Sequence, residues 1–96
     1  LIVMTKSLAR TLGPAIRVNA VAPGFIEGEW LQQGLGDDYE KAKQNRAAGN
    51  ILNAVSTPED IAAGILTMAT ASKTTGHTLV VDAGDTLGPR IVQGLK

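Results

Sequence analysis

Tyr39 and Lys43 are the residues whose spacing is best suited to acid–base chemistry, because three residues separate them. In a helix this spacing places both side chains on one face, one turn apart. A lysine cation beside a phenol lowers the pKa of the phenol, so the pair could transfer a proton. Short motifs of this kind also arise by chance. The alternative interpretation is a solvated helix in which neither side chain does chemistry.

Metal chemistry has little support in the sequence. His77 is the only histidine, and the chain has no cysteine. A metal site needs several such ligands close together, so we predict no metal site and a structural or surface role for His77. The lack of cysteine also excludes a disulfide framework and agrees with a reducing compartment, so we expect a cytoplasmic protein.

Composition narrows the class of protein further. The 96 residues carry nine basic and nine acidic side chains, with a formal net charge of zero. Nucleic-acid binding through bulk positive charge is therefore excluded, since such binding depends on cations that neutralise phosphates. No apolar run approaches the roughly eighteen residues of a membrane-spanning helix. With 44% apolar residues and 11 glycines, the composition is typical of one small, soluble α/β unit.

Periodic patterns predict the elements that would position these residues. Apolar residues recur at helical spacing over 1–12, and alternation over Ile16–Ala22 predicts a strand that Pro23-Gly24 ends. The stretch 25–56 has no strand pattern. Asp37-Asp38 could cap a short helix there that runs to about Ala48.

The second half of the chain repeats the helix-then-strand order. Thr57 followed by Pro58 predicts a helix start. We expect the helix to bury Ile61, Ile65, Leu66 and Ala69 and to end before Ser72. Thr78–Val81 then predicts a short strand. A strand that returns through a helix to another strand forms a right-handed parallel βαβ unit.

Such a unit is not a complete sheet. Two parallel strands alone leave both edges unpaired and one layer of helices absent. The sequence also opens in the middle of a helical pattern at Leu1. We therefore expect further strands from residues upstream of Leu1 or from another chain.

Four motifs together identify a family. In order and spacing they resemble the C-terminal half of the short-chain dehydrogenases/reductases, and the resemblance runs from Leu1 to about Leu87. The motifs are Thr5–Ala9, Ile16–Gly24, Thr57–Ala62 and Thr75–Gly84. Each is weak alone, but four in register are specific.

The resemblance implies an α/β fold, the C-terminal portion of a Rossmann-like doubly wound parallel sheet. Residues 1–96 would be one fragment of that domain, namely its last two strands with flanking helices, and 25–56 would be its substrate-binding loop or lid. The family's glycine-rich turn and its catalytic Ser, Tyr and Lys would lie upstream of Leu1. The Tyr39–Lys43 pair follows the Pro-Gly strand, whereas the family's pair precedes it. We therefore expect no catalytic residue in this chain.

Cofactor contacts are implied just after the first strand. Pro23, Gly24, Phe25 and Ile26 resemble the stretch whose backbone contacts the nicotinamide in this family. Glycine at such a place admits the close approach of a flat ring. Gly28 stands where the family usually has a threonine whose hydroxyl helps to hold the cofactor. The missing hydroxyl predicts a weakened or altered contact rather than a loss of binding.

Several other residues have two interpretations. Trp30 and Leu31 are candidate walls of a substrate pocket, and they could equally anchor the loop to the body of the protein. Asn19 is expected to satisfy backbone groups. Asp82 resembles a family turn in which Ala83 replaces a glycine, so Ala83 would be strained if that position needs a positive φ.

The function implied by the resemblance is NAD(P)-dependent oxidation and reduction. The complete protein would interconvert an alcohol and a ketone by hydride transfer on a small-molecule substrate. Whether it uses NAD or NADP stays open, as does the identity of the substrate. Family members are commonly tetramers, so a homotetramer is expected. The alternative is a truncated, catalytically inactive fragment that acts only as an oligomerisation or structural module.

Overall fold

The computed structural model describes residues 1–88 and 90–92, apart from the side chains of residues 29–31. Its helices and strands follow the predicted order, with additions in the middle. They are α1 (Ile2–Leu12), β1 (Ala20–Pro23), α2 (Glu29–Leu35), the 3-10 turn Gly36–Asp38, α3 (Tyr39–Gly49), α4 (Pro58–Thr70), β2 (Thr78–Val81) and the 3-10 turn Asp85–Leu87.

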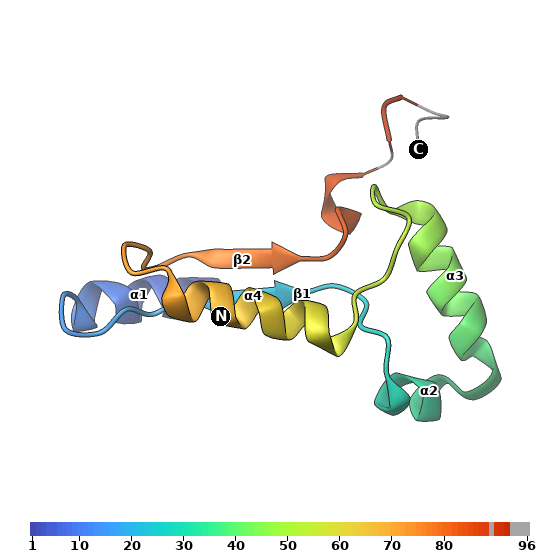
Figure 1. Ribbon diagram of the computed structural model, residues 1–96, viewed down its shortest axis with the longest axis horizontal. Helices are drawn as coiled ribbons and strands as arrows, with labels where there is room; N and C mark the ends of the chain where they lie inside the picture. Colours follow the sequence, from blue (N-terminus) through green and yellow to red (C-terminus); the bar gives the residue numbers. More distant parts are fainter. Residues whose placement is uncertain (89, 93–96) are drawn as a thin grey trace.

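The two strands form a parallel pair, in which Ala20 lies opposite Thr78 and Pro23 lies opposite Val81. Helix α4 covers one face of this pair, and α1 lies on the other side (Figure 1). Helices α2 and α3 lie beyond the carboxyl ends of both strands. The predicted fold class, a parallel βαβ unit with flanking helices, is confirmed.

Strand β1 begins later than predicted. Pairing starts at Ala20 rather than Ile16, because the preceding residues bond to the turn before β2 instead of to a ladder. The amide of Val18 donates to Thr75 Oγ1 at 3.1 Å, and its carbonyl accepts from Gly76 N at 2.7 Å. The expected strand Ile16–Ala22 is thus wrong in its first four residues.

Helix α4 begins where the sequence predicted. Thr57 Oγ1 accepts from the amide of Asp60, and Asp60 Oδ2 accepts from the amide of Thr57 at 2.9 Å. Pro58 opens the helix, where no amide donor is required. This reciprocal capping box satisfies backbone donors that the helix itself leaves unpaired.

The predicted buried face of α4 is largely wrong. Ile65 and Leu66 are 56% and 65% exposed, and Ala69 is exposed as well. The helix instead faces the sheet through Gly64, where a Cβ atom would lie 3.1 Å from Val81 Cγ2. A small residue at the contact brings the helix close to the strands and turns its larger side chains outward.

The segment 25–56 is more helical than its sequence indicates. Helix α2 was not predicted, because Gly34 and Gly36 are poor helix formers at its end. Asp37 and Asp38 lie in a 3-10 turn, and the side chain of Asp38 makes no capping bond to α3. Helix α3 itself starts at Tyr39 and runs one residue beyond the expected end.

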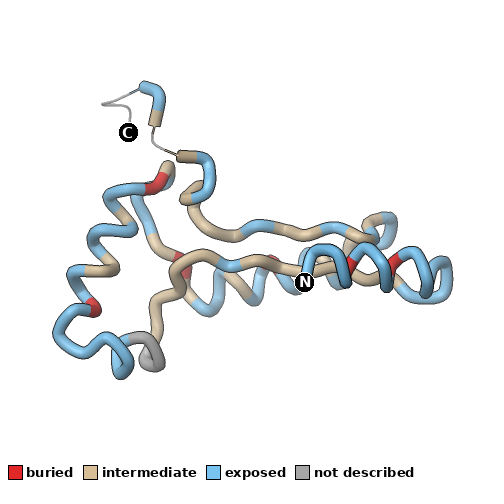
Figure 2. Tube along the Cα trace, turned by 180° about the vertical axis from the view of Figure 1, so that it is seen from behind, coloured by how far each residue is buried: buried red, intermediate tan, exposed pale blue. Residues whose placement is uncertain are grey.

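The described chain has a small and scattered core. Its radius of gyration is 16.1 Å, whereas a compact domain of this length has about 12.5 Å. Buried positions lie apart from one another along the chain (Figure 2). No described large side chain falls below 2% exposure. No helix of the described part of the chain is long and apolar enough to cross a membrane.

Candidate functional site

The predicted cofactor residues begin at the carboxyl ends of the two strands. Pro23 and Val81 end β1 and β2 at the same level, and the amide of Gly24 donates to the carbonyl of Val81 at 3.0 Å. A Cβ atom on Gly24 would lie 2.8 Å from Cβ of Asp82. The close approach therefore requires glycine, and it forms the edge at which open α/β sheets bind ligands.

A short bridge continues this edge beyond β1. Ser56 donates its amide to the carbonyl of Phe25 at 3.2 Å, and its carbonyl accepts from the amide of Glu27 at 2.7 Å. These bonds pair Ile26 with Ser56 in parallel. Successive peptide groups of an extended chain point in opposite directions, so the amide and carbonyl of Ile26 point away from Ser56. Neither group has a hydrogen-bond partner among the described residues, so both can face a ligand.

Gly28 is held by a side chain from α3. Its amide donates to Tyr39 Oη at 3.2 Å, and the ring of Tyr39 stacks on Phe25 with ring centroids 6.4 Å apart. A Cβ atom on Gly28 would meet no atom within 4 Å, and its φ of 171° is extended backbone that any residue adopts. Glycine is not required here, in contrast to Gly24.

The Tyr39–Lys43 pair has structural partners. Tyr39 is only 5% exposed, so the solvated-helix interpretation is wrong for its side chain. Lys43 Nζ lies 2.9 Å from Glu27 Oε1, and this hydrogen bond raises the pKa of Lys43. Both side chains therefore connect α3 to the segment that follows β1. Only their helical spacing in the sequence indicated that they would act together.

The turn after β2 supports the other side of the site. Asp82 accepts from the amides of Gly84 at 2.9 Å and of Thr86 at 3.1 Å. Burial raises the pKa of Asp82, but the hydrogen bonds from Thr86 and Gly84 outweigh it, and the pKa lies below its ordinary value. Ala83 adopts a φ of 56°, the strained conformation anticipated for that position. The carboxylate thus serves to close the turn.

The predicted substrate-pocket residues Trp30 and Leu31 belong to the backbone of α2, but their side chains lie outside the described residues. Their role stays a prediction. His77 is exposed, as expected for a surface residue. Within residues 1–88 and 90–92, no group of three or more His, Cys, Asp or Glu side chains could hold a metal ion.

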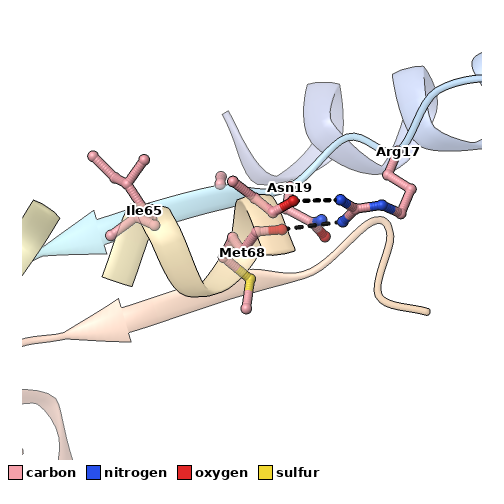
Figure 3. Close-up of a pocket in the computed structure, with 7 residues that line it drawn as sticks. Arg17, Asn19, Ile65 and Met68 are labelled. Carbon is pink, nitrogen blue, oxygen red and sulfur yellow. Dashed lines mark hydrogen bonds between the residues drawn. The ribbon is translucent and has the colours of Figure 1, made fainter. Parts of the chain in front are cut away.

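A second polar cluster lies at the opposite end of the strands (Figure 3). Arg17 donates to the carbonyls of the residues at the end of α4 and in the turn after it, at 2.6 to 3.3 Å; these are Met68, Ala69, Ala71 and Thr74. Asn19 donates to the carbonyl of Thr74 and accepts from the amide of His77. The expectation that Asn19 satisfies backbone groups is confirmed, whereas the role of Arg17 was not anticipated.

This cluster borders a hollow of about 380 Å³ between β1 and α4. Its floor is apolar, with Ile65 and Met68 among the lining residues (Figure 3). The guanidinium of Arg17 offers its donors to carbonyls of the protein itself, which is the arrangement of a helix C-terminal cap. The cluster is therefore structural.

Comparison with known proteins agrees with the geometry. Residues 1–86 match the family model described as enoyl-(acyl carrier protein) reductase. The chain belongs to the short-chain dehydrogenase/reductase family. It corresponds to the C-terminal region of these proteins, as the four sequence motifs implied.

Individual relatives support the assignment. The 3-oxoacyl-[acyl-carrier-protein] reductase FabG of Chlamydia muridarum is 40% identical over 83 residues, covering 83% of this chain and 32% of the relative. The short-chain dehydrogenase/reductase homolog YusR of Bacillus subtilis is 32% identical over 84 residues, covering 88% of this chain and 61% of YusR. A crystal structure of a small-chain dehydrogenase in complex with NADPH superposes with a TM-score of 0.83 at 35% identity, covering 91% of this chain and 39% of that one.

The chain is short beside these proteins. It spans about a third of the length of most curated relatives that it matches, with YusR as the shorter exception. The chain is thus homologous to one part of these longer oxidoreductases.

Proposed function

We propose that the intact protein, meaning the complete product of the gene that encodes residues 1–96, is an NAD(P)-dependent oxidoreductase that interconverts an alcohol and a ketone. The observation that carries this proposal is the edge formed by Gly24, Ile26 and Gly28 beyond the carboxyl end of β1. The structure of a relative with bound NADPH supports the choice of cofactor class.

The residues at this edge fit a nicotinamide. A carboxamide has one donor group and one acceptor group, and one residue of an extended chain presents the complementary pair on one side. The amide and carbonyl of Ile26 point away from the Ser56 bridge and could bind both. Open space in front of Gly28 leaves room for the cofactor beside them. When bound, the nicotinamide supplies the hydride chemistry.

The role of this chain is to bind and orient. Gly24 permits the approach, Ile26 offers the hydrogen bonds, and α2 and α3 lie over the carboxyl end of the sheet, where they could enclose a substrate. In this account Trp30 and Leu31 line the substrate side. The groups that transfer the proton belong to residues outside this chain, and we assign none within it.

Spectrophotometry tests the proposal. The intact protein should consume NADH or NADPH in the presence of a panel of carbonyl compounds. The panel includes a 3-oxoacyl-[acyl-carrier-protein], which the FabG relatives have in their name. Running both nucleotides decides between NAD and NADP. Absence of turnover across the panel, with no binding of either nucleotide, would contradict the proposal.

We also propose that the protein self-associates as a homotetramer in the cytoplasm. Apolar side chains are exposed along α1 and on β2, which favours a surface that another subunit covers. Among them are Val3, Met4 and Leu8 on α1 and Val80 on β2. Light scattering of the intact protein should give four times the monomer mass.

The same exposed surface favours a second candidate function, an inactive oligomerisation or structural module. The two candidates differ in nucleotide binding. A stable assembly that binds neither NADH nor NADPH would support the module and exclude the oxidoreductase.

A further inference from the structure

We infer that Tyr39 is a positioning residue for the cofactor edge: its hydroxyl fixes the Gly28 amide and thereby the path of the chain from Gly24 to Gly28. This inference rests on the proposed function, because it concerns the segment to which the nicotinamide is assigned. It goes beyond the assignment by giving a function to a tyrosine that comes from α3, outside the strand and its motif.

Two contacts from one side chain support the inference. The ring of Tyr39 stacks on Phe25, and its hydroxyl accepts from the amide of Gly28 at 3.2 Å. The side chain therefore spans both ends of a four-residue segment. Because Tyr39 is 5% exposed, water does not compete freely for the hydroxyl, and a hydrogen bond protected from water holds its geometry better than an exposed one.

On its amide side, Gly28 has no restraint from the Ser56 bridge. The Ser56 bridge holds Phe25 and Glu27 but ends before Gly28. Gly28 has no side chain, and open space surrounds the position of its absent Cβ atom. A glycine in open space has wide conformational freedom. The carbonyl of Gly28 accepts from the amide of Gln32 at 3.1 Å, and the Tyr39 hydroxyl is the contact that holds its amide.

The hydroxyl also brings a donor to the edge. A tyrosine oxygen that accepts from an amide keeps its own hydrogen for another acceptor. Gly28 lacks any side-chain hydroxyl, so the Tyr39 hydroxyl is the one that the structure brings to this amide. Tyr39 would then both confine the edge and leave one hydrogen-bond donor beside it.

Backbone amide exchange of the intact protein, followed by NMR, tests the inference without cofactor. In Tyr39→Phe, which removes only the hydroxyl, the Gly28 amide should exchange about tenfold faster, the loss expected for one hydrogen bond. The Glu27 amide, bonded to Ser56, is the internal control and should keep its rate. Lys43→Met is the matched variant, because it removes the other tether from α3 and should leave Gly28 protected.

Binding of NADPH, measured by fluorescence titration, gives the second readout. Tyr39→Phe should raise the Kd for NADPH about three- to tenfold. An unchanged Gly28 rate overturns the inference, and so does faster exchange of Glu27 and Gly28 together, which indicates general loosening. A faster Gly28 rate with an unchanged Kd overturns its link to the cofactor.

The failure of the proposed function has a different signature. A wild-type protein that binds neither nucleotide contradicts the oxidoreductase, while the Gly28 rates still decide whether Tyr39 positions the segment. If Tyr39→Phe fails to fold, the exchange rate of the Gly28 amide in the wild-type protein tests the inference instead. Exchange of its Gly28 amide at the rate of a free peptide would overturn the inference.

Discussion

The two ends of the parallel strand pair use polar groups in opposite ways. At the amino end, Arg17 donates to four backbone carbonyls. The side-chain amide of Asn19 donates to one backbone carbonyl and accepts from one backbone amide. At the carboxyl end, the backbones of the two strands meet at the closely packed Gly24 and the chain continues through the bridge at Ile26. Tyr39 and Asp82 accept from backbone amides beside them. There the amide and carbonyl of one residue point away from their neighbours.

We therefore assign a structural role to the amino end of the strands and a binding role to the carboxyl end. Charged donors that bond to carbonyls of the protein itself stabilise the fold. Unused backbone groups beside a glycine and open space are what a flat, polar ligand requires. Arg17 is thus the more conspicuous side chain, but the proposed site lies at the other end of the sheet.

Removal of the Arg17 guanidinium should have the largest effect on stability. Arg17→Met keeps the aliphatic stem but leaves the four carbonyls without their charged donor, so the free energy of unfolding should fall by about 3 kcal/mol. Urea denaturation of the intact protein measures this loss. Arg10→Met, at an exposed position of α1, is the control and should change stability by less than about 0.5 kcal/mol. A higher Kd for NADPH in a folded Arg17→Met protein would contradict the assignment of structure and binding to opposite ends of the strands.

Gly24→Ala should cause the second largest loss of stability. Its Cβ atom would lie 2.8 Å from that of Asp82, so the strand ends must move apart, at about 2 kcal/mol. We also expect weaker NADPH binding. The matched control is Gly28→Ala, which enters open space in extended backbone and should cost less than about 0.5 kcal/mol. Equal destabilisation by the two alanines would contradict the close packing at Gly24.

Thr57→Ala should remove one half of the α4 capping box and cost about 1 kcal/mol. Thr57 follows Ser56, but the bridge from Ser56 to the Ile26 segment is made by backbone groups that this substitution leaves in place. The Kd for NADPH should therefore stay the same. Thermal melting compares it with Thr67→Ala, an exposed helical threonine, for which we expect a change close to zero.

The smallest effect concerns pH. Backbone and side-chain hydrogen bonds from Thr57 lower the pKa of Asp60 below its ordinary 3.8. A pKa that is lower in the folded state stabilises the protein above the unfolded value, and this contribution is lost as the pH falls below about 3.8. Wild type should therefore be more stable than Asp60→Asn at neutral pH, with the difference shrinking in acid. A difference that grows in acid would reverse the assigned sign.

Local rules predicted the elements that are determined locally. The Thr57–Asp60 cap and the strand Thr78–Val81 follow from side-chain types within a few residues. The start of β1 could not be predicted in this way, because Val18 hydrogen-bonds to Thr75, which lies 57 residues later in the chain. The exposure of Ile65 and Leu66 could not be predicted, because helical spacing identifies an apolar face but not the element that covers it.

The candidate site rests on the resemblance of Pro23–Ile26 to a known stretch, and its role in cofactor binding stays a prediction. The approach of Gly24 to Asp82 and the placement of Tyr39 against Gly28 depend on tertiary packing, which no spacing rule contains. Tyr39 was singled out in the sequence for proton transfer beside Lys43. In the structure its partners are Phe25 and Gly28.

Hydrogen–deuterium exchange of the intact protein, with and without NADPH, tests the central claim most directly. The account predicts that NADPH slows exchange in the segment Gly24–Gly28, while the segment Arg17–Asn19 keeps its rates. Protection confined to the Arg17 end, or none at either end in a folded protein saturated with the nucleotide, would contradict it.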